Sequence, residues 1–235
     1  LASVRAAAQE VVEAGPLDVV VANAGVVARG YRRTADGFEM QVGVNFLGHF
    51  ALVGLLLPHL LQGSAPRVVA VSSLASHAGR LGPRWLNAPG PGREATRAYP
   101  SSKLALLTWS QELARRSAAA GTGLLSVAAH PGYVDTELLL QGERASGRAF
   151  MRFAGKVAGL RPEQGAEPVL AAATVDGLEG GDYLGPRLGG FRGTPGRAWL
   201  GGVPQDPEQG HKLWDWAEHM TGVQVPAPFR ENPGE

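Results

Sequence analysis

The sequence predicts an α/β fold in which helices cover both faces of a doubly wound parallel sheet. Short apolar runs alternate with longer helical segments along the chain, which is typical of strand–helix–strand units. The runs are continuous rather than alternating, as expected of strands that are buried on both faces. Small or polar residues follow each of the first three runs, and ligands bind beyond the carboxyl ends of the strands in such sheets.

The N-terminal half predicts two helices and two strands. Residues 2–14 are rich in alanine and place apolar residues at helical spacing, until a Gly-Pro pair ends the helix. The run LDVVVANAG, 17–25, predicts the first buried strand. Residues 37–62 predict a long helix whose last turn is kinked by its proline, and RVVAVSS, 67–73, predicts the second strand.

The C-terminal half continues the alternation. A loop rich in glycine and proline spans 79–92, and helical spacing resumes over 97–119. LLSVAAHPG, 124–132, predicts the third strand, and residues 137–160 predict a helical excursion with many small residues. Three further elements complete the prediction: a helix at 162–175, a strand at 182–184 and a helix at 207–221.

The composition fits one globular domain over residues 1–235 and excludes several classes of function. Apolar residues make up 44 % and charged residues 18 %, and the net charge is +1 without a basic stripe, so nucleic-acid binding is not expected. The absence of cysteine excludes disulfides, thiolate catalysis and cysteine-ligated zinc. No other metal site is expected, and a reducing cytoplasm is the predicted compartment.

The uncharged segment from Met40 to Pro66 is long enough to cross a membrane. It contains Gln41, Asn45 and two histidines, however, and a spanning helix tolerates such polar content poorly. The predicted structure is therefore a long buried helix, and no membrane span is expected.

Tyr99 and Lys103, in the stretch AYPSSK, form a candidate catalytic pair. Residues four apart share a helix face, and a proline such as Pro100 is harmless in the first helical turn, so both side chains are predicted near the ligand edge of the sheet. A lysine ammonium favours the phenolate, lowers the tyrosine pKa and suits the phenol for general acid–base catalysis. The same spacing also occurs by chance in many helices that have no catalytic role.

Two other polar residues accompany this pair. Ser73 ends the second predicted strand, where its hydroxyl could donate a hydrogen bond to a substrate carbonyl oxygen. Asn45 lies in an otherwise apolar helix and must find partners for its amide. The alternative interpretation of Asn45 is an amide that is satisfied within the core.

Five motifs in order resemble the short-chain dehydrogenase/reductase family over nearly the whole chain, to about Gly222. They are ANAG (22–25), VNFLGHF (44–50), VVAVSS (68–73), YPSSK (99–103) and HPGYVDTEL (130–138). The resemblance implies a Rossmann-like sheet and an NAD(P)-dependent enzyme that interconverts an alcohol and a ketone or aldehyde. A non-catalytic binding or scaffold protein with the same fold, or an inactive fragment, is the alternative.

The resemblance implies a role for each matching residue. Tyr99 would be the general acid in carbonyl reduction and the base in alcohol oxidation. Lys103 would lower its pKa and bind the nicotinamide ribose. Ser73, rather than Ser72, would hold the substrate oxygen, and Asn45 would hold a water that links Lys103 to solvent. The cofactor itself would supply the hydride.

The same resemblance places the cofactor, NADP or NAD with NADP favoured, along the strand ends. One wall of the cleft would be formed by residues of ANAG, and the nicotinamide would lie against the third strand end. The implied cofactor-binding residues are Asn23, Ala24, Gly25, Tyr99, Lys103, Pro131, Gly132, Val134 and Thr136.

A finer resemblance is to the retinol-dehydrogenase-like and WW-domain-oxidoreductase-like branch. The interval from Ser73 to Tyr99 is long and carries Trp85, and the VNFLGHF motif and the histidine before Pro-Gly also match. This branch handles apolar alcohols and carbonyls, so a small apolar substrate is implied. Loop 79–97 and excursion 137–160 would shape its site. Simple packing over the sheet is an equally good interpretation of any single apolar residue there.

The chain departs from the family at its start. The family begins with a strand, TGxxxGxG and a helix, which bind the pyrophosphate, and no such stretch is found here. The first three strands are therefore expected to be missing, and Leu1 in place of methionine favours a fragment over a naturally short relative. The run LDVVV would then be an exposed apolar edge, and this chain alone should show weak or absent activity. Family analogy also suggests a homodimer or homotetramer through helices 37–62 and 97–119.

Overall fold

The computed structural model describes residues 1–28, 30–88, 90–92, 94–132, 160–200 and 206–229. The elements follow the predicted order of helices and strands. They are α1 (Ala2–Ala14), β1 (Val19–Ala22), α2 (Met40–Val42), the π-helical turn η1 (Gly43–Leu47), α3 (Gly48–Leu60), β2 (Arg67–Val71), the 3₁₀ turn η2 (Leu74–Ala78), α4 (Pro83–Leu86), η3 (Ala95–Arg97), α5 (Ala98–Ala120), β3 (Leu125–Ala129), α8 (Pro162–Thr174), β4 (Tyr183–Leu188), β5 (Arg192–Arg197), α9 (Pro207–Thr221) and η4 (Ala227–Phe229). The predicted excursion 137–160 lies outside the described residues, apart from Leu160.

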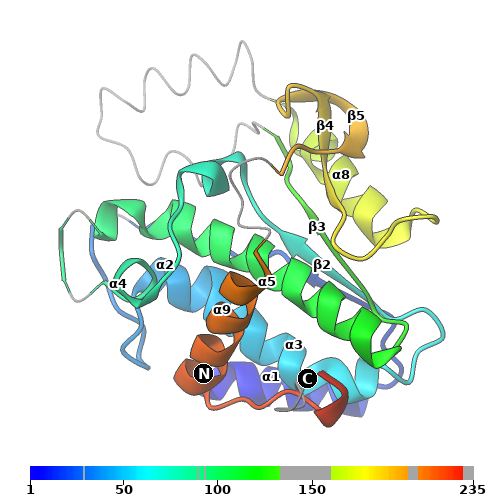
Figure 1. The fold of residues 1–235 in the computed structure, drawn as a ribbon, viewed down its shortest axis with the longest axis horizontal. Coiled ribbons are helices and arrows are strands. Elements are labelled where there is room, and N and C mark those ends of the chain that lie inside the picture. Colours follow the sequence, from blue (N-terminus) through cyan, green and yellow to red (C-terminus); the bar gives the residue numbers. More distant parts are fainter. Residues whose placement is uncertain (29, 89, 93, 133–159, 201–205, 230–235) are drawn as a thin grey trace.

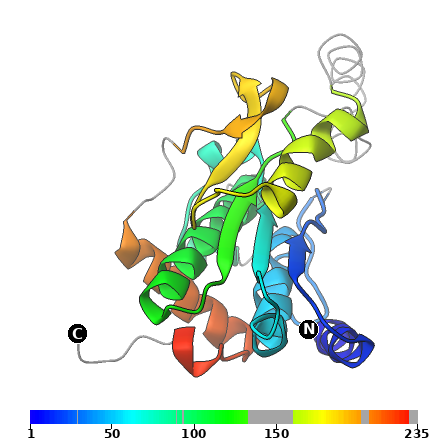
Figure 2. The same cartoon turned by 90° about the vertical axis from the view of Figure 1, so that its right-hand side faces the viewer.

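The strands form one five-stranded sheet in the order β1-β2-β3-β4-β5 (Figures 1 and 2). The first four strands are parallel, with Val20 opposite Val68 and Val69 opposite Val127, and β5 returns antiparallel to β4. The carboxyl ends of β1, β2, β3 and β4 therefore meet at one edge of the sheet. The predicted α/β class with a doubly wound parallel sheet is confirmed.

Helices cover the sheet on both faces, as the continuous apolar strands require. On one face α3 and α5 lie against β1, β2 and β3, and on the other α8 crosses β2, β3 and β4. Alternate residues of β2 point to opposite faces, so Val68 and Ala70 join the larger core with α3 and α5, while Val69 joins Val127 under α8. This arrangement fixes the strand ends from which the candidate site is built.

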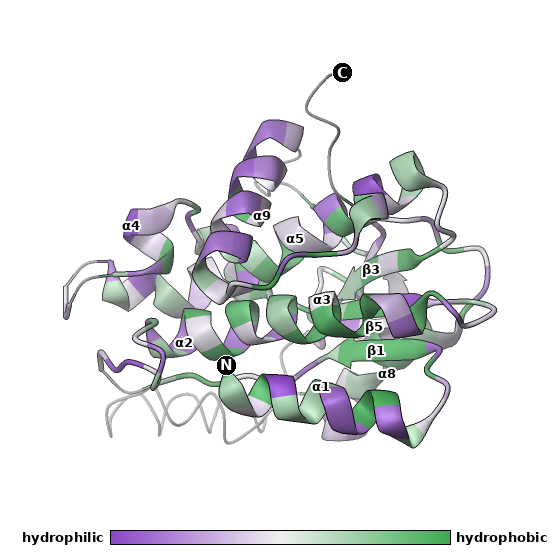
Figure 3. Cartoon of the chain, turned by 90° about the horizontal axis from the view of Figure 1, so that it is seen from below, coloured by the Kyte–Doolittle hydropathy of each residue, from purple (hydrophilic) through white to green (hydrophobic). Residues whose placement is uncertain are grey.

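Strand β1 leaves an open apolar edge, as the sequence predicts. It pairs only with β2 in the part of the chain that the structure describes, and Figure 3 shows it hydrophobic along its length. Val19 and Val21 are 36 % and 42 % exposed, whereas Val20 on the opposite face is buried. An unpaired edge of this kind is a template for pairing with another strand.

The long helix expected at 37–62 is one of the core helices of the fold. The stretch Met40–Leu60 is apolar and long enough to cross a membrane, but 72 % of its most apolar window is buried inside the protein. A core helix passes the same test of length and composition, so this stretch is only weak support for a membrane span.

Helix α9 packs across α5 and α3 on the side away from the sheet (Figure 1). Arg116 of α5 lies 4.3 Å above the ring of Trp214 of α9 and donates to the carbonyl oxygen of Phe229 at 2.8 Å. The predicted dimer or tetramer through α3 and α5 stays a prediction, and it would have to use surfaces of these helices that α9 leaves free.

Strand β5 was not predicted, because the last strand expected from the sequence is the one at 182–184. Its sequence, RGTPGR, has no apolar residue and two glycines, so neither periodicity nor propensity indicates a strand. Gly189 and Gly190 adopt φ values of 63° and 79° and turn the chain back, which lets β5 pair with β4. The hairpin forms because of this turn rather than because of an apolar face.

Candidate active site

A cleft of about 700 Å³ lies at the carboxyl ends of β1, β2 and β3. Its walls come from segments that are distant in the sequence but meet at this edge of the sheet, and α8 closes one side. The lining residues are Val21, Asn23, Ala24, Gly25, Val71, Ser72, Ser73, Tyr99, Lys103, Pro131, Gly132, Pro162, Gly165, Ala166, Val169 and Leu170. The predicted Tyr99, Lys103 and Ser73 are therefore brought together in one cavity.

Tyr99 lies in the first turn of α5, directly before Pro100, as predicted. This turn is held close to η2 by Gly79, since a Cβ on that glycine would lie 2.5 Å from the Pro100 carbonyl oxygen. Ser73 caps η2 by accepting a hydrogen bond from Ala75 N at 3.2 Å. The serine hydroxyl and the phenol thus approach the cleft from two elements that are packed tightly together.

The pKa of Tyr99 differs from the sequence prediction. Burial of the phenol raises its pKa above the ordinary value, and a hydrogen bond with Ser73 offsets part of the increase. The predicted lowering by Lys103 is not found, because the desolvation of the phenolate dominates. In the cleft of this chain, Tyr99 is a protonated phenol at neutral pH, which is the form of a general acid.

Lys103 is buried beneath the cleft with only 5 % of its surface exposed. Its Nζ donates a hydrogen bond to the carbonyl oxygen of Val71, the last residue of β2, at 2.8 Å. Burial lowers the pKa of Lys103 from 10.5 to about 8. The ammonium can therefore exchange protons close to physiological pH, which an exposed lysine cannot do readily.

Asn45 lies within the π-helical turn η1 and has no exposed surface. Its Oδ1 accepts from Val26 N at 2.7 Å, and its Nδ2 donates to Val26 O and to Ser102 Oγ, both at 3.0 Å. Ser102 Oγ in turn donates to the carbonyl oxygen of Tyr99 at 2.8 Å. Asn45 therefore joins the segment after β1 to the first turn of α5, and a π-helical turn of this kind is frequent at functional sites.

Two residues of this network were missed by sequence reasoning. Ser102 lies inside the quoted YPSSK motif, and that position is the only signal that could have found it. His49 Nδ1 lies 3.1 Å from the carbonyl oxygen of Asn45. Burial lowers the pKa of His49 to about 4, so the imidazole is neutral and Nδ1–H donates this hydrogen bond. His49 follows Asn45 by four residues and completes its hydrogen bonding.

Two glycines of the cleft, Gly25 and Gly132, leave space that is suited to the nicotinamide end of a dinucleotide. A Cβ on Gly25 would lie 3.3 Å from Asn45 Oδ1 and 3.5 Å from Lys103 Nζ, so a side chain there would close the space above the lysine. Gly132 adopts φ 76° and donates from its N–H to His130 Nδ1 at 3.2 Å, which fixes the turn after β3. These residues leave room for a ring against Tyr99 and Lys103. The expected phosphate-binding motif is absent from the sequence.

The described residues hold most of the predicted site but not all of it. Asn23, Ala24, Gly25, Pro131 and Gly132 line the cleft with Tyr99 and Lys103. Ser72 donates to the carbonyl oxygen of Lys103 at 2.9 Å and is buried, whereas Ser73 is half-buried; the preference for Ser73 stays a prediction. The predicted residues Val134 and Thr136 lie outside the described ranges, as does the part of the predicted excursion that carries Leu138 to Leu140, Phe150, Met151 and Phe153.

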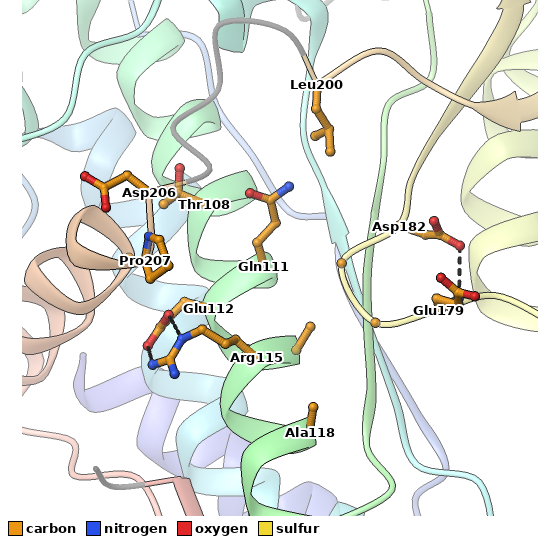
Figure 4. A pocket seen from close by; sticks show the side chains of 14 residues that line it. Thr108, Gln111, Glu112, Arg115, Ala118, Glu179, Asp182, Leu200, Asp206 and Pro207 are labelled. Carbon is orange, nitrogen blue, oxygen red and sulfur yellow. Dashed lines mark hydrogen bonds and ion pairs between the residues drawn. The ribbon is translucent and has the colours of Figure 1, made fainter. Parts of the chain in front are cut away.

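A second cavity, of about 520 Å³, lies away from this pair, between α5, the start of α9 and the turn before β4 (Figure 4). Three of its carboxylates are engaged within the protein. Glu112 accepts from Arg115 and Arg116, Asp206 caps α9, and Asp182 binds Arg197. No nucleophile–base pair converges on it among the described residues, so the cleft at the strand ends is the better candidate for an active site.

Replacing Asn45 with leucine should lower the free energy of unfolding by about 3 kcal/mol, because it leaves the Val26 N–H and C=O without their partners. Urea denaturation measures this loss. Gln62→Ala, which removes one exposed hydrogen bond to Pro58 O, is the control and should change stability by less than about 0.5 kcal/mol. Equal effects of the two substitutions would show that Asn45 does not join these segments.

The stability contributed by Lys103 should rise with pH. Its folded-state pKa of about 8 lies below the ordinary 10.5, so the folded protein binds fewer protons than the unfolded chain between these values. Below pH 8 the folded protein bears the full cost of burying the charged ammonium, and above pH 10.5 it bears none. The free energy of unfolding should therefore rise by on the order of 3 kcal/mol between these values. Urea denaturation across this range measures it against Lys103→Met. A difference between the two proteins that stays constant with pH contradicts a buried, titrating Lys103.

The sequence is similar to those of several known proteins. Residues 1–145 match the family model described as short chain dehydrogenase. Retinol dehydrogenase 11 of Homo sapiens is 36 % identical over 216 residues, which are 89 % of this chain and 62 % of the relative. Polyprenol dehydrogenase of Mus musculus is 38 % identical over 236 residues, which are 95 % of this chain and 66 % of the relative. The chain thus spans less than two thirds of the length of these two relatives.

Solved structures share the fold. An uncharacterized protein from Mycobacterium Paratuberculosis superposes with a TM-score of 0.74 at 36 % identity, covering 93 % of this chain and 72 % of that chain. The NADP complex of Pseudomonas aeruginosa RhlG superposes with a TM-score of 0.55 at 23 % identity, covering 77 % and 70 %. Because the family model covers more than half of the sequence and the cleft gathers the motif residues, this chain belongs to the short-chain dehydrogenase family.

Proposed function

We propose that the protein is an NAD(P)-dependent oxidoreductase that interconverts an alcohol and a ketone or aldehyde by hydride transfer. The observation that carries this proposal is the convergence of Tyr99, Lys103 and Ser73 on one cleft at the strand ends. A phenol, a buried ammonium and a hydroxyl in one cavity suit proton transfer to or from a substrate oxygen. Membership of the short-chain dehydrogenase family supports the same reaction class.

In the direction of carbonyl reduction, Tyr99 donates its phenolic proton to the substrate oxygen, and Ser73 holds that oxygen with a second hydrogen bond. When bound, the cofactor supplies the hydride that the substrate carbon receives. Lys103, with its pKa near 8, lines the same cleft and can supply a proton that restores the phenol. In alcohol oxidation the same groups act in reverse, with the Tyr99 phenolate as the base.

Asn45 supports this chemistry by holding two segments of the cleft in place. Its amide holds the segment after β1 and, through Ser102, the backbone of Tyr99. We assign it the role of fixing the distance between the two walls of the cleft, and we retain the prediction that it helps to hold a water beside Lys103. Residues of ANAG and the Pro131-Gly132 turn would hold the nicotinamide half of the cofactor.

The substrate class that we propose is an apolar alcohol or carbonyl, and the cofactor is NADP(H) in preference to NAD(H). The names of the relatives, retinol and polyprenol dehydrogenases, support an apolar substrate. Most side chains that α8 contributes to the cleft are apolar or small, including Val169 and Leu170. The cytoplasm remains the predicted compartment.

The proposed activity is tested by oxidation of the nicotinamide cofactor in the presence of apolar aldehydes and ketones, with NADPH and NADH compared. The assay is run on this chain and on a longer protein that contains it with a TGxxxGxG segment. Turnover of an apolar aldehyde by the longer protein, faster with NADPH, is the expected result. A longer protein that binds cofactor but reduces none of the carbonyls would contradict the proposal.

A second candidate function is non-catalytic binding, and the open edge of β1 favours it for the chain by itself. Val19 and Val21 are exposed, and β1 pairs only with β2 among the described residues. Titration of this chain with NADPH, followed by cofactor fluorescence, should therefore reveal no tight site. Binding with a Kd of about 1 μM or below would show that the missing glycine motif is dispensable.

A further inference from the structure

His130 is a buried histidine that the proposed chemistry does not use. It directly follows β3, is 1 % exposed and is not among the residues that line the cleft. Its backbone N–H donates to the carbonyl oxygen of Leu184 at 2.9 Å, and its ring lies against the ring of Tyr183 with 5.1 Å between centroids. Burying an imidazole costs free energy unless its polar atoms find partners, so its place in the core requires an explanation.

The imidazole accepts a hydrogen bond from the turn that lines the cleft. The N–H of Gly132 donates to His130 Nδ1 at 3.2 Å, which makes Nδ1 the unprotonated nitrogen of the ring. Burial, and more weakly the nearby His77, lower the pKa of His130 to about 4, so the ring is neutral at physiological pH and keeps this acceptor. Asparagine and aspartate hold turns in a similar way, by accepting from the backbone two residues further on.

Two glycines of the β4–β5 hairpin form a socket for this ring. A Cβ on Gly185 would overlap Nε2 of His130 and lie 2.6 Å from its Cδ2 and Cε1, so the ring occupies the place of a side chain. A Cβ on Gly190 would lie 3.4 Å from His130 Cε1. The hairpin therefore determines where the imidazole can lie.

The hairpin also contacts the turn itself. A Cβ on Gly132 would lie 2.9 Å from Pro186 Cγ and 3.0 Å from the Phe191 carbonyl oxygen. Strand β4 continues beyond the end of β3, so the turn of the hairpin lies at the same sheet edge as the cleft (Figures 1 and 2). The Pro131-Gly132 turn is thus held by the hairpin on one side and by the His130 ring on another.

We propose that His130 is a positioning residue that fixes the Pro131-Gly132 turn as a wall of the nicotinamide site, and that Gly185 and Gly190 are the socket for its ring. This role rests on the proposed function, because it requires a nicotinamide cofactor in the cleft. His130 touches neither cofactor nor substrate and acts through the Gly132 N–H. The backbone of the hairpin and the affinity for cofactor are thereby linked.

Two substitutions separate the hydrogen bond from the packing, in a longer protein that contains this chain with a TGxxxGxG segment. His130→Leu fills a similar volume but offers no acceptor, so it should raise the Kd for NADPH by about tenfold. His130→Asn loses packing on Tyr183 but keeps an acceptor for the Gly132 N–H, so its Kd should stay within about threefold of the wild type. His59→Leu removes a ring that contacts the Gly15 carbonyl oxygen and does not line the cleft; it is the matched control and should bind like the wild type.

The socket is tested by Gly185→Ala in the same longer protein. The added methyl group displaces the imidazole, so the Kd for NADPH should rise by at least about tenfold. His130→Ser has no ring and can still accept through its hydroxyl oxygen, so Gly185→Ala added to this variant should raise the Kd by less than about threefold. Equal effects of Gly185→Ala in the two backgrounds would overturn the socket.

A further readout, in this chain itself, needs neither cofactor nor turnover. Nitrogen NMR of the His130 imidazole should show Nδ1 unprotonated and Nε2 protonated at neutral pH, and the Gly132 amide should exchange about tenfold faster in His130→Leu than in the wild type. A protonated Nδ1, equal amide exchange, or NADPH binding by His130→Leu as tight as by the wild type overturns the role of His130. A longer wild-type protein that binds no nicotinamide cofactor would overturn the proposed function, and with it this role, even where the Gly132 amide behaves as expected.

Discussion

Tyr99→Phe, made in a longer protein that contains this chain with a TGxxxGxG segment, should reduce turnover by roughly 10²–10⁴-fold while leaving cofactor affinity nearly unchanged. The substitution removes only the hydroxyl that donates the proton, and the ring remains packed at the start of α5. The phenol is half-buried and hydrogen-bonded to Ser73, so water is a poor substitute for it. Steady-state kinetics with an apolar aldehyde and a cofactor titration measure the two quantities.

Tyr31→Phe is the matched control for that experiment. Its hydroxyl donates to the Ala88 carbonyl oxygen at 2.8 Å, and Tyr31 does not line the cleft. The control should therefore lose about 1 kcal/mol of stability and keep its turnover. Equal turnover by Tyr99→Phe and the wild type would remove Tyr99 from the mechanism.

Gly79→Ala should be strongly destabilising and should also impair catalysis. The added Cβ would lie 2.5 Å from the Pro100 carbonyl oxygen and 2.8 Å from Leu104 Cβ, and neither can move without the first turns of α5. Overpacking of this kind costs about 3 kcal/mol, and a displaced Tyr99 costs turnover on the order of 10²-fold. Urea denaturation and steady-state kinetics measure the two effects.

Gly90→Ala is the control for Gly79→Ala, because a Cβ at that position would meet nothing within 4 Å. It should leave stability within about 0.5 kcal/mol of the wild type. If Gly79→Ala behaved in the same way, η2 and α5 could not be held as closely as the structure places them, and the packing explanation for the position of Tyr99 would be wrong.

The sequence predicted the helices and parallel strands well because their signals are local. Helices α1 and α9 begin and end at the predicted residues, where a Gly-Pro pair follows the first, and an aspartate cap and Gly222 flank the second. The continuous apolar runs predicted β2 and β3 because these strands are buried on both faces, and the same pattern predicted β1, which is exposed on one face in the structure. Strand β5 was missed because its pairing depends on a glycine turn and not on its own side chains.

The sequence predicted which residues lie near the strand ends but not their protonation or their partners, and their roles in catalysis stay predictions. Motif spacing brought Tyr99, Lys103 and Ser73 to one sheet edge, and the structure gathers them in one cleft. The direction of the Tyr99 pKa was wrong, because the extent of burial cannot be seen in a spacing pattern. The hydrogen-bond partners of Lys103 and Asn45 could not be predicted from the sequence either, because Lys103 donates to the backbone of Val71 and Asn45 accepts from the backbone of Val26. Only the fold determines which carbonyl lies opposite a buried side chain.

The most direct test is a crystal structure of the protein with a nicotinamide cofactor and an apolar ketone analogue. We predict the ketone oxygen within about 2.6–3.2 Å of both the Tyr99 hydroxyl and the Ser73 hydroxyl, with Lys103 beneath the nicotinamide ribose. A ketone oxygen bound elsewhere, such as in the cavity beside Gln111 and Asp206, or one that contacts neither hydroxyl, would contradict the assignment of this cleft as the active site.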